Sequence, residues 1–156
     1  MSHFDTPPRE ASGDAWASAL WAPPAHVPPR VLVADDDDAM RHLVAQTLSK
    51  DGFDVLQVSN GGRLLVALAR EIVAKPGPDL VDLLVSDIRM PVCTGIQILE
   101  QIRASGWRMP VILMTAFGDA ATRERAAKLG ALLLDKPFEM DTLRLAARHL
   151  LRQPTE

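Results

Sequence analysis

The feature that most constrains the fold is a regular alternation of short apolar runs with longer amphipathic stripes between residues 31 and 152. Short apolar runs are typical of strands buried on both faces, whereas apolar residues three or four apart mark one face of a helix. The five expected strands are Val31–Ala34, Phe53–Val58, Leu83–Asp87, Val111–Thr115 and Leu132–Leu134. Because parallel neighbours need long crossovers, five strands that alternate with five helices predict an α/β fold with a doubly wound parallel sheet.

The five expected helices are defined by apolar residues at helical spacing and by the residues that end each helix. In chain order, the residues that define the helices are Met40, Leu43, Val44, Thr47 and Leu48 for the first; Leu64, Leu65, Leu68 and Ile72 for the second; Ile96, Leu99 and Ile102 for the third; the span Asp119–Leu129 for the fourth; and Leu143, Ala147, Leu150 and Leu151 for the fifth. Asp51-Gly52, Pro76-Gly77-Pro78 and Gly130 are the expected ends of the first, second and fourth helices.

Composition limits the class of protein. The chain has 156 residues, of which 47% are hydrophobic and 24% charged, as in a globular domain with a tail. A net charge of −3 gives no basic footprint for DNA, and no apolar run is long enough to span a membrane. The N-terminus lacks a secretory pattern, and the single cysteine, Cys93, fits a loop in a reducing compartment. These features predict a cytoplasmic protein.

The chain is expected to divide into an N-terminal extension at 1–29, one domain at 30–152 and a tail at 153–156. Six of the twelve prolines lie within the first 29 residues, which favours an extended and poorly packed backbone there. Trp16, Leu20 and Trp21 recur at helical spacing, so a short docking helix is the alternative reading of this segment.

Reactive polar residues follow four of the expected strands. Asp35-Asp36 ends the first strand, Asp87 the third and Thr115 the fourth, and Lys136 follows the fifth. A doubly wound sheet gathers these ends along one rim, where ligands bind. Three carboxylates repel one another unless a cation intervenes, and an all-oxygen ligand set suits Mg²⁺ better than zinc. A carboxylate near a metal, a hydroxyl and a lysine is suited to attack phosphorus.

These residues occur in an ordered set of motifs that resembles the receiver domain of two-component response regulators. The motifs are Asp35-Asp36, Ser86–Pro91 with Gly95 downstream, Met114-Thr115-Ala116 and Lys136-Pro137-Phe138, and the resemblance covers about residues 30 to 152. It implies a flavodoxin-like fold with a five-stranded parallel sheet in the order 2-1-3-4-5.

The resemblance also implies roles for the acidic residues. Asp87 is the expected phosphoacceptor, which takes a phosphoryl group from the histidine of a sensor kinase. Asp36 and Asp87 would hold Mg²⁺ directly together with the backbone carbonyl of Arg89. Asp35 would hold the ion through water.

The remaining motifs imply supporting roles and two departures from the family pattern. Lys136 would pair with the phosphoryl oxygens, Thr115 would swing in to hydrogen-bond one of them, and the Lys136-Pro137 bond is expected to be cis. Val92-Cys93-Thr94 differs from the usual residues before the glycine. Leu133 stands where the fifth strand usually has Tyr or Phe, so the readout of phosphorylation is expected to differ.

The leading functional hypothesis is a stand-alone receiver, because only Gln153 to Glu156 follow the last expected helix. Its chemistry would be confined to its own phosphorylation and dephosphorylation, so it is not expected to be an enzyme. It would signal by binding another protein or by relaying the phosphoryl group to a histidine phosphotransfer protein. The alternatives are a Mg²⁺-dependent phosphohydrolase and a phosphorylation-independent scaffold.

Two surface features carry further expectations. Arg123, Arg125 and Lys128 on the fourth helix, and Arg144, Arg148 and Arg152 on the fifth, predict a basic face beside the fifth strand that binds an acidic protein surface. Family dimers use the face made by helix 4, strand 5 and helix 5. Arg89 and Phe117 each lie two residues beyond a site residue, where family geometry places the path of attacking water. Neither side chain can act as a base, so a long-lived phosphoryl group is expected.

Overall fold

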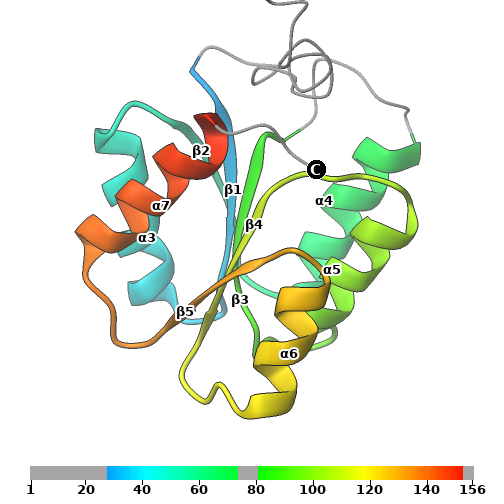
Figure 1. Ribbon diagram of the computed structural model, residues 1–156. Coiled ribbons are helices and arrows are strands. Elements are labelled where there is room, and N and C mark those ends of the chain that lie inside the picture. Colours follow the sequence, from blue (N-terminus) through cyan, green and yellow to red (C-terminus); the bar gives the residue numbers. More distant parts are fainter. Residues whose placement is uncertain (1–27, 74–80, 153–156) are drawn as a thin grey trace, which may run out of the picture.

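The protein forms a five-stranded parallel sheet with helices on both faces (Figure 1). The computed structural model describes residues 28–73 and 81–152, with the backbone alone for residues 71–73. The strands are β1 (Arg30–Ala34), β2 (Asp54–Val58), β3 (Leu83–Asp87), β4 (Val111–Thr115) and β5 (Leu132–Asp135). Their order in the sheet is β2-β1-β3-β4-β5, so the predicted fold class is confirmed.

Five helices in the described part of the chain connect the strands. They are α3 (Asp38–Lys50), α4 (Gly61–Val73), α5 (Gly95–Ala104), α6 (Ala120–Lys128) and α7 (Met140–Arg152). In Figure 1, α3 and α7 lie on one side of the sheet and α4 and α5 on the other. None of these described helices is long and apolar enough to cross a membrane.

Two hydrophobic clusters, one on each face of the sheet, form the core. Every residue of β3 and β4 is buried, and their side chains alternate between the two clusters, as the pleat requires. Leu84, for example, packs in the cluster of α4, α5 and α6, whereas Leu83 and Val85 pack in the cluster of α3 and α7. The covered faces leave the ends of the strands as the accessible parts of the central sheet.

Two residues that the sequence assigned to buried stripes are exposed. Leu43 keeps 46% of its surface accessible and Leu65 keeps 38%, so their predicted burial is wrong. Each is the immediate neighbour of a fully buried residue, Val44 or Leu64, and the rotation of one residue along a helix carries it to the margin of the apolar face.

Several sequence predictions concern residues outside the described ranges. The alternative docking helix with Trp16, Leu20 and Trp21 lies there, as do the Pro76-Gly77-Pro78 helix end and the tail from Gln153. The side chain of Ile72 also lies outside them. Within the described part, Gly130 follows α6 with a φ of 74°, which agrees with the predicted cap, and the Lys136-Pro137 bond is cis as expected.

Candidate functional site

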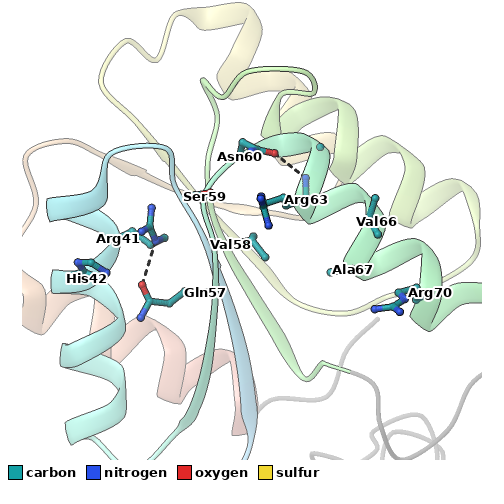
Figure 2. Close-up of a pocket in the computed structure, with 11 residues that line it drawn as sticks. Arg41, His42, Gln57, Val58, Ser59, Asn60, Arg63, Val66, Ala67 and Arg70 are labelled. Atoms are coloured by element: carbon teal, nitrogen blue, oxygen red, sulfur yellow. Dashed lines mark hydrogen bonds between the residues drawn. The ribbon is translucent and has the colours of Figure 1, made fainter.

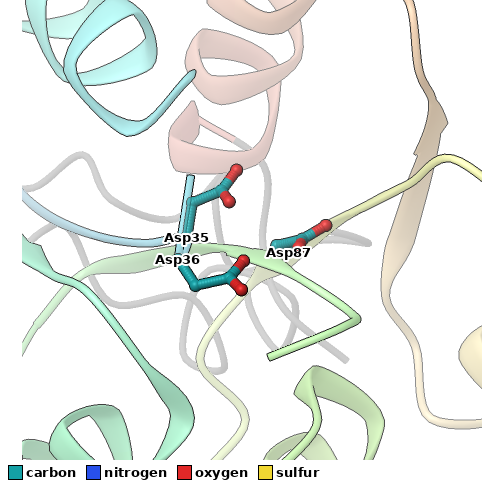
Figure 3. A group of neighbouring side chains, drawn as sticks. All are labelled: Asp35, Asp36 and Asp87. Carbon is teal, nitrogen blue, oxygen red and sulfur yellow. The ribbon is translucent and has the colours of Figure 1, made fainter. Parts of the chain in front are cut away.

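The carboxyl ends of the central strands bring the predicted site residues to one rim of the sheet. Parallel pairing sets Ala34 beside Ser86, Asp87 beside Met114, and Thr115 beside Asp135, so β1, β3, β4 and β5 end at similar levels. The residues at the carboxyl ends of these four strands are therefore neighbours in space. Figure 3 shows Asp35, Asp36 and Asp87 side by side at this rim.

The three carboxylates form a compact acidic cluster. One oxygen from each of Asp35, Asp36 and Asp87 lies within 4.8 Å of the other two. Asp35 is fully buried, Asp87 is 7% exposed and Asp36 is exposed. The backbone N–H of Asp37 donates to Asp35 Oδ1 at 3.0 Å, which fixes that carboxylate at the start of α3. The cluster therefore presents oxygen atoms at several depths, from the core to the solvent.

Lys136 bridges two of these carboxylates. Its Nζ lies 3.4 Å from Asp35 Oδ2 and 3.2 Å from Asp87 Oδ1. Burial lowers the pKa of Lys136, but the attraction of Asp87 and Asp35 outweighs burial and raises this pKa above its usual value. Burial and the repulsion of Asp35 raise the pKa of Asp87 to about 6, although Lys136 opposes the rise. The charges at the rim are thus strongly coupled.

Thr115 and Lys136 are joined through the backbone. The Lys136 N–H donates to the Thr115 carbonyl at 2.7 Å, which continues the pairing of β4 and β5 to the site. The Thr115 hydroxyl is buried and accepts a hydrogen bond from the Phe117 N–H at 3.1 Å. A hydroxyl that accepts in this way still has its own proton to donate.

Gly95 sets the path of the turn after Asp87. A Cβ at this position would lie 2.6 Å from the Asp87 carbonyl oxygen, a distance that no side chain tolerates without backbone movement. The Gly95 N–H donates to the Ile88 carbonyl at 2.9 Å and so closes the loop that contains Arg89. The motif therefore requires glycine at this position because any side chain would collide with the backbone of Asp87.

Two contacts near the rim escaped the sequence analysis. The Arg89 guanidinium carbon lies 5.1 Å from the centre of the Phe117 ring, a cation–π contact between the β3 and β4 loops. Phe117 is 70% exposed, so this pair is a surface feature. In addition, Arg41 Nη1 donates to the Asp35 backbone carbonyl at 3.0 Å. No pattern in the sequence signals either contact, because each joins residues from separate segments through side-chain conformation.

The donor set fits a hard divalent cation. Carboxylate oxygens are the preferred ligands of Mg²⁺, which also retains water and therefore tolerates an open, partly exposed site. The exposed Asp36 lies on the open side of the cluster. The pKa of Asp87 is raised first by burial and then by the repulsion of Asp35, and a cation would offset this repulsion. The side chains of Asp35, Asp36 and Asp87 could hold such an ion.

The prediction that the face beside β5 is basic is wrong. Ion pairs join Arg123 to Asp135 at 2.6 Å, Arg125 to Glu100 and Lys128 to Glu124 at 3.7 Å. The α7 arginines Arg144 and Arg148 pair with Asp51 at the end of α3. This face is therefore mixed in sign, because carboxylates from neighbouring elements offset the cations that the sequence placed there.

The strand order and the acidic rim agree with the receiver-like fold and site that the sequence motifs imply. In agreement, a family model described as "Response regulator receiver domain" matches residues 31–148, and the chain belongs to this family. Phosphorylation and Mg²⁺ binding are typical of the family, whose members act in two-component systems as signalling modules.

Individual relatives agree with this assignment. The chain is 34% identical over 123 residues to sporulation initiation phosphotransferase F of Bacillus subtilis, with 78% of this chain and 93% of the relative covered. It is 36% identical over 124 residues to the regulatory protein AtoC of Escherichia coli, covering 79% of this chain and 25% of AtoC. Several relatives are thus much longer than the matched region, which spans about half of the mycobacterial response regulator MprA.

Solved structures show the same fold. The receiver domain of the Francisella response regulator 1452 superposes with a TM-score of 0.70 at 27% identity, over 80% of this chain and 97% of that one. Full-length FixJ from B. japonicum superposes with a TM-score of 0.68 at 35% identity, over 81% of this chain and 59% of FixJ.

Proposed function

We propose that this protein is the phosphoacceptor of a two-component system and that Asp87 takes a phosphoryl group from a phosphohistidine of a sensor kinase. The observation that carries the proposal is the position of the Asp87 carboxylate, which is 7% exposed, clustered with two further carboxylates and 3.2 Å from the Lys136 ammonium. Membership of the receiver family supports the same assignment.

In the transfer step, an Asp87 carboxylate oxygen attacks phosphorus and forms a P–O bond. The P–N bond to the kinase imidazole breaks, and its electron pair stays on the imidazole nitrogen. The Lys136 ammonium, already beside Asp87 Oδ1, binds a phosphoryl oxygen as a fixed positive charge. The Thr115 hydroxyl turns its free proton toward another phosphoryl oxygen. Positioning and charge neutralisation supply most of the catalysis in such transfers.

The acidic cluster is the proposed Mg²⁺ site. Asp36, Asp87 and the Arg89 carbonyl would hold the ion directly, and Asp35 would hold it through water. When bound, the ion would supply charge neutralisation for the phosphoryl oxygens. The buried Asp35, fixed by the Asp37 N–H, keeps the cluster in place whether or not the acceptor is phosphorylated.

The signal leaves the domain through contact with another protein or through relay to a histidine phosphotransfer protein. Similarity across 93% of a sporulation initiation phosphotransferase supports a receiver that works without an attached output domain. The face made by α6, β5 and α7 is the proposed surface for a homodimer or partner. Leu133, half-buried in β5, replaces the usual aromatic switch residue, so this face responds to phosphate by another route. The single cysteine suits action in the cytoplasm.

Intact-mass measurement after incubation with acetyl phosphate tests the proposal. One phosphate adduct is expected with Mg²⁺, none with EDTA and none in Asp87→Asn. Glu139→Gln is the matched control, because it removes one negative charge at an exposed position outside the site. An adduct that survives Asp87→Asn contradicts the proposal. Failure of the wild type to form an adduct favours a scaffold, and multiple turnover on small phosphoesters favours a phosphohydrolase.

A further inference from the structure

A groove of about 740 Å³ crosses the β2 edge of the sheet and reaches the end of β2 beside the acidic rim, where the Val58 carbonyl accepts from the Asp35 N–H. Residues of α3, β2 and α4 line it, and none of those described is acidic. Figure 2 shows Arg41 and His42 on one side of the strand, with Gln57 beside Arg41, and Arg63 and Arg70 on the other side. The groove therefore brings cations from two helices to the two flanks of one edge strand.

No carboxylate of a described residue offsets the positive charge on the α4 flank. Arg63 and Arg70 lie seven residues apart, which places them on the same side of α4 about 10 Å apart along its axis. Neither forms an ion pair with a described residue, in contrast to the arginines of α6, which pair with carboxylates. On the other flank, Arg41 pairs with Asp38 at 2.7 Å. In a protein of net charge −3, this groove is a local patch of positive charge.

The strand between the two flanks has a free edge. Hydrogen bonds at both ends of β2, from the Asp54 N–H and to the Val58 carbonyl, point toward β1. Backbone groups alternate in direction along a strand, so the N–H and carbonyl groups of Val55 and Gln57 point outward. No strand in the described part of the chain pairs with this side of β2. Unpaired groups of this kind are a template for another strand.

We propose that the groove binds an extended acidic segment of a partner protein, which adds to the sheet as a sixth strand beside β2. Carboxylates on one face of such a strand recur about every 7 Å, within reach of the flexible Arg63 and Arg70 side chains. Val66, which lines the groove between Arg63 and Arg70 and is 60% exposed, offers apolar contact between the charges. Backbone pairing supplies affinity, and the arginines select for acidic sequences. Asp87 does not line this groove, so the proposed site is distinct from the phosphoacceptor.

A labelled peptide of alternating glutamate and valine is the probe, with a lysine-valine peptide of equal length as the matched control. Fluorescence anisotropy should detect binding of the acidic peptide alone, with affinity that falls as salt rises. Arg63→Glu with Arg70→Glu should weaken binding by about tenfold or more. Lys50→Glu with Arg152→Glu makes the same charge change away from the groove and should have a much smaller effect. Arg63→Gln with Arg70→Gln provides a milder pair if the glutamate variant folds poorly.

Hydrogen exchange followed by NMR separates strand addition from simple anion binding. The acidic peptide should protect the Val55 and Gln57 amides, whose N–H groups point outward. Gln57→Pro removes one of these donors at an edge where proline is tolerated, and it should weaken binding well beyond Gln57→Ala. The proposal is overturned if the arginine changes leave peptide affinity unaltered. It is also overturned if the peptide binds without amide protection, or if tripolyphosphate binds more tightly at the same arginines, which would indicate a phosphate site.

Discussion

Replacement of the acceptor carboxylate by its neutral isostere should stabilise the metal-free protein. Burial and the repulsion of Asp35 raise the pKa of Asp87 from 3.8 to about 6, although Lys136 opposes the rise. The folded protein therefore binds this proton more tightly than the unfolded chain does. The stability that this proton contributes is complete below about pH 4 and is lost as the pH rises through 6. In the Asp87→Asn variant, a neutral group stands at this position at every pH.

The size of the effect follows from the two pKa values. At pH 8 the difference between them corresponds to about 3 kcal/mol of unfolding free energy that Asp87→Asn should gain. At pH 5 the folded wild type is still mostly protonated, so the gain should be about half as large. Urea unfolding followed by circular dichroism, in EDTA at both pH values, measures the two gains. Glu139→Gln is the control for a general change in charge.

The dependence on pH is the decisive part of this experiment. A variant that is destabilised, or equally stabilised at pH 5 and pH 8, would show that the Asp87 carboxylate is not held at elevated energy by its surroundings. Addition of Mg²⁺ should stabilise the wild type more than Asp87→Asn, because the ion binds the folded cluster.

Three further outcomes are expected. Phe117→Glu combined with Arg89→Asn should speed hydrolysis of the phosphoryl group by about tenfold, which corresponds to about 1.4 kcal/mol of barrier. The introduced glutamate and asparagine could orient the attacking water, which the original side chains cannot do. An unchanged decay rate would refute this account of the lifetime. Arg103→Met should lower unfolding free energy by about 2 kcal/mol, since Arg103 donates to three backbone carbonyls that would lose their partner. Arg148→Met should lower the melting temperature at pH 7. Arg148 holds the pKa of Asp51 below its usual value, so the deficit should narrow in acid, as the carboxyl protonates; a deficit independent of pH would exclude this ion pair as the cause.

The sequence was sufficient for the fold because its signals are local and redundant. The apolar runs of β3 and β4 are buried at every residue, and helical stripes such as Leu64 with Leu68 give the covering faces. Parallel strands end at one rim, so residues far apart in sequence, such as Asp35 and Asp87, were expected to meet. The assignment of separate roles to them came from the family resemblance, since spacing alone gives no role.

The remaining features depend on side-chain conformation and long-range charge. The sequence counted the α7 arginines as a free basic surface, whereas Arg148 reaches Asp51 across 97 positions of the chain. In the same way, Arg89 and Phe117 were both expected beside the path of attacking water, but their mutual contact depends on how two loops approach each other. The exposure of Leu43 reflects where the margin of a helix face falls, which periodicity alone does not fix.

Chemical trapping of the phosphorylated residue tests the central claim most directly. Borohydride reduces an aspartyl phosphate to homoserine, and peptide mapping by mass spectrometry then identifies the position. After incubation with acetyl phosphate and Mg²⁺, homoserine is expected at position 87 alone, and its yield should fall when EDTA is present. Homoserine at Asp35 or Asp36, or an unmodified Asp87 in protein that carries phosphate, would contradict the assignment of Asp87 as the acceptor.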